Sequence, residues 1–282
     1  MGINQRWEFN GIEALRIGRY GRKINTTCFL YRIGGTVIDT GPPNQWRKVR
    51  AFLNENPVKR VLITHHHEDH GGNGARIQNQ LKAALYAHEH GVALHGNGFH
   101  VPFYRRLVWG KPGGRFTPEV LPETVEMENG FSLKPLHSPG HAVDQVCFLE
   151  PNRGWLFTGD LYVSCKPKYL RGEEDPNLEI QSLRDILSQD FDTVFCSHQG
   201  RLEKGRQALK AKLNYLISLR EQVRHYRRIG DSIAEIKKRL MGREAFLYWF
   251  SGGEFSKRNY IKAFAFPKPE PSADLEPLPE SD

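Results

Sequence analysis

The sequence of 282 residues has no run of 18 or more apolar residues, so it offers no transmembrane helix and predicts no membrane partner. The first ten residues are polar and lack the apolar core of a secretory signal, so none is expected. Only four cysteines occur, without a C-x-x-C pair, which is typical of a reduced, cytoplasmic protein. Two of them, Cys147 and Cys196, lie in apolar runs where buried free thiols are expected, and the others are Cys28 and Cys165.

The net charge of +8 is unevenly distributed along the chain. Residues 201–262 contain 16 Lys and Arg against 6 Asp and Glu, whereas the remainder contains 24 against 26. A basic segment of this kind can bind nucleic acid or an acidic partner. It is also typical of helices whose charged faces are solvated, and we favour that interpretation.

Strand-like and helix-like segments alternate in the first part of the chain, which indicates an α/β fold. The pair Gly34-Gly35 between two apolar runs predicts a tight hairpin. The expected strands are residues 12–17, 27–33, 36–39, 58–64 and 85–87, and the expected helices are residues 46–54 and 74–81.

A second set of strands is expected at residues 124–128, 131–136, 146–150, 155–157 and 193–196, with a helix at 178–187. Helical spacing then dominates residues 202–228, 232–240 and 255–264. The end of the chain is rich in proline and acidic residues, which predicts disorder. We therefore divide the chain into a catalytic domain (1–200), a basic helical region (201–266) and a disordered acidic, proline-rich tail (267–282).

Residues 96–122 break the alternation with five glycines and four prolines. A long loop inside a compact domain is usually functional or disordered, and the aromatic residues here argue against disorder. The segment could form an apolar wall of a substrate pocket or a cover over a sheet edge. The candidate pocket residues are His100, Phe103, Tyr104 and Trp109.

The most informative motif, THHHEDHGG at residues 64–72, follows the expected strand 58–64 and contains H-x-H-x-D-H. Further candidate ligands come later, each at the end of an expected strand or in the loop after one, where rigid scaffolds present functional groups. Imidazole and carboxylate groups suit zinc, iron or manganese. The seven candidates are His65, His67, Asp69, His70, His141, Asp160 and His198.

Other histidines are expected to lie outside this site. We interpret His66 as a spacer that points away from the ligands. The remaining ones in this part of the chain, His88, His90 and His95, are expected on the surface of a helix.

These residues resemble the five motifs of the metallo-β-lactamase superfamily over about residues 10–200, with Asp39 as the first motif. The resemblance implies a four-layer αββα sandwich with the site along one sheet edge and, here, a C-terminal helical appendage. It implies that Asp39 hydrogen-bonds the histidine loop from behind without binding metal. The implied ligands are His65, His67 and His141 for one metal and Asp69, His70 and His198 for the other, with Asp160 bridging both.

The expected cofactors are two divalent ions, with zinc favoured and iron or manganese as alternatives. A water molecule shared by the two ions would lose its proton near neutral pH. Asp69 could orient that hydroxide or carry a proton, and Tyr162 could hydrogen-bond a substrate oxygen. Three cations follow that could attract a carboxylate or phosphate, although each taken alone is expected to be solvated: Lys166, Lys168 and Arg171. The leading interpretation is hydrolysis of a small-molecule ester, thioester or lactone, as in the glyoxalase-II-like and lactonase-like members that the chain resembles.

Other functions stay open. A two-metal centre can also cleave phosphodiesters, and the basic C-terminal region favours this, although no large insert separates Asp160 from His198. A single-iron persulfide dioxygenase or a non-enzymatic sensor would also keep part of the site. β-Lactam cleavage is disfavoured because the β-lactam-cleaving members of the superfamily usually lack an aspartate at the position of Asp160. The flavin-linked di-iron members are disfavoured because they carry a glutamate at the position of His67. The oligomeric state is open, including a homodimer.

Overall fold

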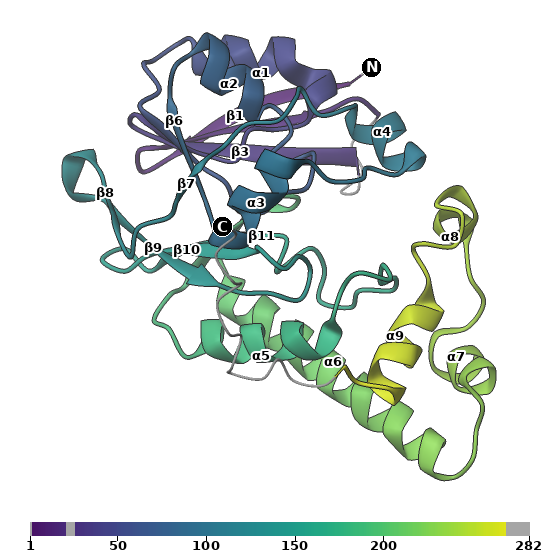
Figure 1. Cartoon of the computed structure of the whole chain (residues 1–282). Coiled ribbons are helices and arrows are strands. Elements are labelled where there is room, and N and C mark those ends of the chain that lie inside the picture. The colour runs from purple at the N-terminus through teal and green to yellow at the C-terminus, as the bar shows by residue number, and fades with distance from the viewer. Residues whose placement is uncertain (1, 21–25, 269–282) are drawn as a thin grey trace, which may run out of the picture.

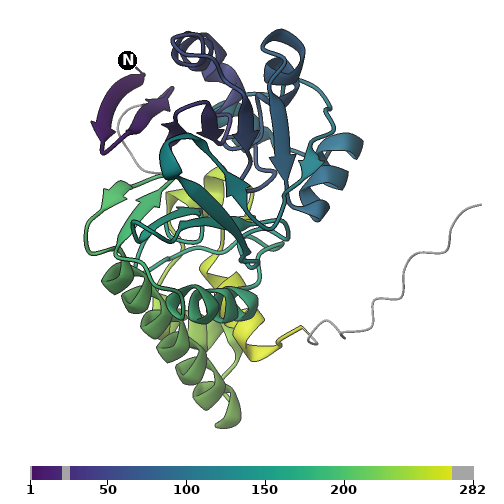
Figure 2. The same cartoon turned by 90° about the vertical axis from the view of Figure 1, so that its left-hand side faces the viewer.

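The computed structural model describes residues 2–20 and 26–268, and it arranges them as two β-sheets between outer layers of helices (Figures 1 and 2). The first sheet has seven strands in the order β1-β2-β3-β4-β5-β6-β7, and the second has six in the order β13-β12-β11-β10-β9-β8. The predicted four-layer αββα sandwich is therefore confirmed. The predicted disorder of the tail falls mostly on residues 269–282, which lie outside the described residues.

The first sheet begins as an antiparallel meander and continues in parallel. Strands β1 (Ile3–Phe9), β2 (Ile12–Gly18), β3 (Thr27–Ile33) and β4 (Thr36–Ile38) are antiparallel to their neighbours, and the Gly34-Gly35 turn joins the last two. Parallel strands β5 (Arg60–Leu62), β6 (Ala84–Ala87) and β7 (Glu119–Val120) follow. Between them run α1 (Trp46–Leu53), α2 (Gly74–Gln80), α3 (Glu89–Asn97) and α4 (Phe103–Trp109).

The second sheet is mainly antiparallel. It contains β8 (Val125–Glu126), β9 (Ser132–His137), β10 (Val146–Glu150), β11 (Trp155–Gly159), β12 (Thr193–Cys196) and β13 (Gly200–Leu202). Only the β11–β12 pair is parallel among the described strands of this sheet, and α5 (Pro176–Leu187) connects the two. Two short 3₁₀ turns, Pro43–Gln45 and Glu128–Gly130, complete the sandwich.

Alternation along the strands assigns each side chain to one of the packed layers. In β3, Phe29 and Tyr31 pack between the two sheets, whereas Cys28 and Leu30 face the helices α1 and α2. This period of two is the pattern of a strand buried on both faces. A third cluster fills the space between the second sheet and its helices, and it includes Leu156, Leu183, Leu209, Leu216 and Phe264.

Two hydrogen bonds join the edges of the two sheets. The amide of Phe29 donates to the carbonyl of Ser197 over 2.7 Å, and the amide of Val146 donates to the carbonyl of Thr64 over 2.8 Å. Both bonds lie beside the loops that carry the candidate metal ligands. The two halves of the candidate site are therefore held together by main chain.

The C-terminal helices cover the second sheet and continue beyond it (Figure 1). They are α6 (Gly205–Arg228), α7 (Ile233–Met241), α8 (Phe246–Phe250) and α9 (Lys257–Ala265). A short backbone bridge between Leu170 and Ser256 ties this region to the loop that follows β11. Within the described residues, we find no helix with the length and apolar character that a membrane crossing requires.

Some elements differ from the sequence expectations. Strand β1 was not predicted because its side chains are mostly exposed and polar. The segment 96–122 contains the helix α4, which the surrounding glycines and prolines obscured. The free thiols of Cys147 and Cys196 are buried, as expected.

Candidate metal centre

The seven candidate ligands come from loops at one edge of the two sheets. The motif that includes His65 and His70 follows β5, and His141 follows β9 after the Ser138-Pro139-Gly140 turn. Asp160 and His198 follow the adjacent parallel strands β11 and β12. Because the carboxyl ends of these strands meet at one edge, residues far apart in the sequence come together.

Three of the histidines form the first cluster. His67 Nδ1 lies 2.8 Å from His65 Nε2 and 3.1 Å from His141 Nε2. Zinc–nitrogen bonds are about 2.0–2.1 Å long, so three nitrogens at this spacing can bind one ion. His65 and His67 are buried, and His141 is partly exposed toward the cavity described below.

The second cluster consists of Asp69, His70 and His198. Asp69 Oδ2 lies 3.6 Å from His70 Nε2 and 3.5 Å from His198 Nε2. Asp160 contacts both clusters, with Oδ2 3.1 Å from His198 Nε2 and 3.4 Å from His141 Nε2. The structure therefore brings all seven predicted residues together and places Asp160 between the two groups.

The chemistry of these residues fits a pair of divalent cations. His70 Nε2 and Asp160 Oδ1 are buried and lie 3.4 Å apart, and neither makes a hydrogen bond of normal geometry with the described atoms. A buried polar atom without a partner costs free energy, unless a bound ion satisfies it. The donor set of imidazole and carboxylate suits zinc, iron or manganese.

Hydrogen bonds on the outer ring nitrogens orient two of the histidines. His70 Nδ1 lies 2.8 Å from Asp39 Oδ2, and His198 Nδ1 lies 2.7 Å from the carbonyl oxygen of Thr27. Each Nδ1–H can donate there, which leaves the Nε2 lone pair free to face the cluster. Asp39 also accepts from the amide and hydroxyl of Thr64, so it braces the histidine loop from behind without joining a cluster.

The electrostatics of the two clusters differ. Burial lowers the pKa of His65 and of His67 well below the usual value, and nearby positive groups act in the same direction. Burial alone would lower the pKa of His70, but the carboxylates of Asp69 and Asp160 raise it well above that value. His65 and His67 therefore present neutral imidazoles, the form that binds metal, whereas His70 lies beside carboxylates that favour its charged form.

Two further residues lie beside the first cluster: Glu174, which the sequence analysis did not identify, and Arg171, which it expected to be solvated. Glu174 Oε1 lies 3.1 Å from His141 Nδ1, and the Arg171 guanidinium pairs with Glu174 and with Glu173. Arg171 is 3% exposed, so the expectation that it is solvated is wrong. Its NH2 group lies 3.2 Å from His67 Nε2. The charged run at residues 171–175 looks like a solvated loop, and no periodic pattern signals its burial.

A buried ion pair fixes the histidine loop from the other side. Arg105 on α4 donates from Nε and NH2 to the two carboxylate oxygens of Glu68 over 2.7 and 2.5 Å. Glu68 is fully buried and stands between His67 and Asp69 in the motif. The helix inserted in segment 96–122 therefore positions the ligand loop directly. Nearby, His66 bonds buried Asp144, so it has a bracing contact and is more than a spacer.

Five of the seven candidate ligands line a cavity of about 590 Å³: His67, Asp69, His141, Asp160 and His198. Helix α4 supplies one wall and the C-terminal region supplies another, so residues beyond 200 belong to the lining. The buried cations of the lining, Arg105, Arg171 and Lys212, are each paired with a carboxylate. Lys166 and Lys168 also line the cavity, and no ion pair is found for them among the described residues. The apolar lining comprises Tyr104, Val108, Trp109, Val163, Leu170, Phe246, Leu247, Phe250, Phe255 and Tyr260.

The predicted pocket residues separate into two groups. Tyr104 and Trp109 line the cavity, and the Trp109 ring lies 6.1 Å from that of His198. Phe103 is 76% exposed, and His100 lines a different cavity. The side chain of Tyr162 packs in the hydrophobic cluster under the second sheet and is not among the described residues that line the metal cavity. This placement does not support the expectation that its phenol reaches the metals.

His95 is buried, so the expectation of a helix-surface position is wrong. Its ring packs 4.4 Å from that of Phe116, and burial lowers its pKa from 6.5 to about 4. The unfolded chain therefore takes up a proton as pH falls below 6.5, whereas the folded protein does not until about pH 4. Stability is unaffected above pH 6.5 and declines between these two values.

We therefore expect wild type to lose up to about 2 kcal/mol more unfolding free energy between pH 7 and pH 5 than His95→Gln does. Urea denaturation of the metal-free proteins at the two pH values measures this difference. Exposed His90→Gln is the control and should keep the wild-type loss. Equal losses in wild type and His95→Gln would show that His95 is not the titrating group.

The fold, the two ligand clusters and their shared aspartate define a class of metal-binding proteins. The family model of the metallo-β-lactamase superfamily matches residues 22–198. The chain belongs to the metallo-β-lactamase superfamily, which confirms the resemblance seen in the sequence.

Individual relatives are more distant. The chain is 34% identical over 128 residues to an atrochrysone carboxyl ACP thioesterase of Aspergillus chevalieri, a match covering 44% of this chain and 35% of that protein. It is 26% identical over 183 residues to a hydroxyacylglutathione hydrolase of Idiomarina loihiensis, covering 62% and 60% of the two chains. The chain thus spans 35% of the length of the thioesterase and 60% of the length of the hydroxyacylglutathione hydrolase.

A solved β-lactamase domain protein from Burkholderia ambifaria superposes with a TM-score of 0.70 at 18% identity. The match covers 90% of this chain and 86% of that one. This share is larger than residues 1–200 could supply, so the shared fold includes part of the C-terminal helical region.

Proposed function

We propose that this chain is a hydrolase that binds two divalent metal ions and cleaves an ester or thioester of an apolar acyl group. The observation that carries the proposal is the set of seven potential ligands in two clusters that both contact Asp160, five of which line a cavity with aromatic walls. His65, His67 and His141 would hold one ion, and Asp69, His70 and His198 the other. Bound there, the ions would act as Lewis acids and make water a nucleophile near neutral pH.

The surrounding residues support hydrolysis at a carbonyl group. If His67 binds metal through Nδ1, its Nε2 carries a proton and cannot accept from Arg171. The NH2 group of Arg171 is then free to donate to a substrate oxygen and to stabilise charge that develops there. Water would add to the acyl carbon as the C–S or C–O bond breaks, and the leaving thiol or alcohol takes the remaining proton.

The lining of the cavity favours an apolar acyl group. Aromatic and aliphatic side chains from α4, α8 and the start of α9 face the ligands across about 590 Å³. A volume of this size suits a small organic molecule. The names of the two relatives, a thioesterase and a hydroxyacylglutathione hydrolase, support acyl-transfer chemistry of this kind.

The test combines metal analysis with a substrate panel on one preparation. We expect about two ions per chain, with zinc the first expectation, and turnover of a thioester or an ester. The panel adds a lactone and a bis-aryl phosphate. Cleavage of the phosphate alone would favour the nuclease alternative, and one iron per chain with oxygen uptake would favour the dioxygenase. A metal-free, inert protein would overturn the proposal.

Shortening the apolar wall should change which acyl chains are accepted. Phe250 lines the cavity and its ring lies 6.0 Å from that of Tyr104. We expect Phe250→Ala to raise KM about tenfold for a long acyl thioester and little for an acetyl thioester, since lost apolar contact is worth about 1–3 kcal/mol. Trp249→Ala is the matched control because Trp249 is on the same helix but is 74% exposed and outside the lining. Equal effects on both thioesters would argue against an acyl site here.

A further inference from the structure

The outer ring nitrogen of His141 lies at hydrogen-bond distance from a carboxylate. His141 Nδ1 is 3.1 Å from Glu174 Oε1, whereas His141 Nε2 faces the first cluster at 3.1 Å from His67 Nδ1. The neighbouring Glu173 approaches His67 Nε2 only to 3.7 Å. An Nδ1–H group that donates to a carboxylate leaves the Nε2 lone pair of the same ring free for a metal.

The carboxylate of Glu174 is held through both of its oxygens. Oε1 accepts from Nε of Arg171 over 2.9 Å, and Oε2 accepts from the main-chain amide of Arg171 over 3.0 Å. The side chains of Glu174 and Arg171 are only 10% and 4% exposed. Charge-assisted hydrogen bonds away from solvent are strong and restrict rotation. Glu174 can therefore hold the ring of His141 in one orientation.

Main-chain hydrogen bonds fix Glu174 relative to His141. The amide of Asp175 donates to the carbonyl of Gly140 over 2.8 Å. The residue after Glu174 is thus joined to the residue before His141. The contact between the two side chains therefore does not depend on a free loop.

The C-terminal region fixes the other end of this charged run. Leu170, which precedes Arg171, exchanges two backbone hydrogen bonds with Ser256, of 3.2 and 3.1 Å. Its carbonyl also accepts from Asn259 Nδ2 over 2.8 Å. Arg171 and Glu174 are accordingly held between α9 on one side and the His141 loop on the other.

The charge of Arg171 gives Glu174 a second effect on the same cluster. The NH2 group of Arg171 lies 3.4 Å from His141 Nε2 and 3.2 Å from His67 Nε2. A guanidinium group stays protonated in proteins, so by itself it repels a cation held by these histidines. The carboxylate of Glu174 offsets this charge beside the cluster.

We propose that Glu174 is a positioning residue for the metal ion of the first cluster, which it serves by orienting His141 and by offsetting the charge of Arg171. The inference rests on the metal binding of the proposed function, and it assigns a role to a residue outside the seven ligands. It requires that loss of the carboxylate weaken one of the two proposed ions and spare the other.

Competition between the zinc-loaded protein and a chromophoric chelator measures the affinity for each ion. We expect Glu174→Gln to weaken the ion of the first cluster about 10- to 100-fold and to leave the second within about threefold. Glu173→Gln is the matched control, since Glu173 also pairs with Arg171 but its side chain is 54% exposed. No described hydrogen bond or ion pair joins Glu173 to His141, and both ions should stay within about threefold of wild type.

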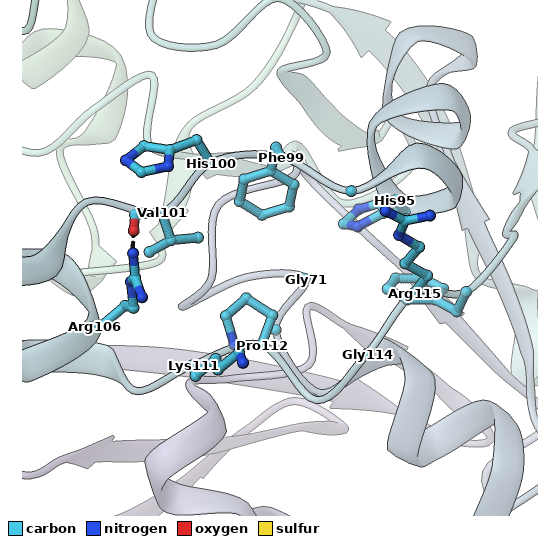
Figure 3. A pocket seen from close by; sticks show the side chains of 13 residues that line it. Gly71, His95, Phe99, His100, Val101, Arg106, Lys111, Pro112, Gly114 and Arg115 are labelled. Carbon is cyan, nitrogen blue, oxygen red and sulfur yellow. Dashed lines mark hydrogen bonds between the residues drawn. The ribbon is translucent and has the colours of Figure 1, made fainter.

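Arg171→Met separates the carboxylate from the ion pair as a whole. This variant keeps the contact between Glu174 and His141 and removes the nearby cation, so it should bind the first ion at least as tightly as wild type does. Arg106→Met controls for loss of a cation, because Arg106 bonds the carbonyl of Val101 beside a separate cavity of about 300 Å³ (Figure 3). Equal weakening in Arg171→Met and Glu174→Gln would overturn the proposal.

Nitrogen-15 spectra of the histidine rings provide a readout that a merely structural role would not change. In the zinc-loaded wild type, His141 should carry a proton on Nδ1 that exchanges slowly with water, and Glu174→Gln should exchange it faster. The melting temperature of each metal-free variant shows whether it is folded. If wild type binds two ions and Glu174→Gln binds both as tightly, this inference alone fails. If wild type binds no metal, the proposed function fails with it.

Discussion

Replacing Asp160 by alanine is expected to lower the metal content from about two ions per chain to one or none and to abolish hydrolysis. Asp160 contacts histidines of both clusters, with Oδ2 3.1 Å from His198 Nε2 and 3.4 Å from His141 Nε2. If Asp160 bridges the two proposed ions, its removal takes one ligand from each and leaves the two cations without the carboxylate between them. Elemental analysis after gel filtration, followed by an assay with the preferred thioester or ester, measures both effects.

Two further variants make this result specific. Asp39→Ala removes a residue that contacts the ring of His70 from behind, so we expect a smaller loss of metal affinity, about 10- to 100-fold. His225→Ala removes an exposed imidazole on α6, outside the groups of potential metal ligands, and should retain full metal content. If Asp160→Ala bound two ions as tightly as wild type does, the assignment of Asp160 as the shared ligand would be wrong.

Replacing Arg105 by methionine is expected to lower the unfolding free energy by about 3–5 kcal/mol, because it leaves the buried carboxylate of Glu68 unpaired. Glu68 is fully buried and receives two hydrogen bonds from Arg105. Urea denaturation of the metal-free protein measures the loss without a contribution from bound metal. Metal affinity should also fall, since Glu68 lies between His67 and Asp69.

The double variant Glu68→Gln, Arg105→Met tests the cause. Removing the charge of Glu68 as well should recover much of the lost stability, since the penalty comes from a buried, unpaired charge. Arg228→Met, an exposed substitution on α6, should change stability by no more than about 0.5 kcal/mol. A loss of the same size in the double variant would show that packing, not charge, is responsible.

The candidate ligands could be predicted from the sequence because each lies at the end of an expected strand or in the loop after one. The run before His65, for example, is buried on both sides in β5, and the motif after it has fixed spacing. The strand β3 was predictable for a similar reason, since its seven residues are all buried. Strong apolar patterning therefore located both the sheets and the loops at their ends.

The parts that could not be predicted depend on burial of charged groups. Arg171 and Glu174 lie in a run of charged residues, and only the tertiary structure shows that they are enclosed together beside His141. Helix α4 was obscured because a segment rich in glycine and proline carries no helical period. The burial of His95 depends on Phe116, which comes from the same segment. Whether a polar side chain meets a partner or solvent is decided by residues far away in the chain.

The hydrogen bonds that join the edges of the two sheets, from Phe29 to Ser197 and from Val146 to Thr64, also have a consequence for how the protein unfolds. The ligands span residues 65 to 198, so neither half of the sandwich can open without separating some of them. Two bound metal ions would then stabilise both halves of the sandwich together. The global unfolding free energy would therefore rise as the concentration of free metal increases. Slow-exchanging amides should accordingly become protected together in both sheets, rather than only in the loops that touch the metal.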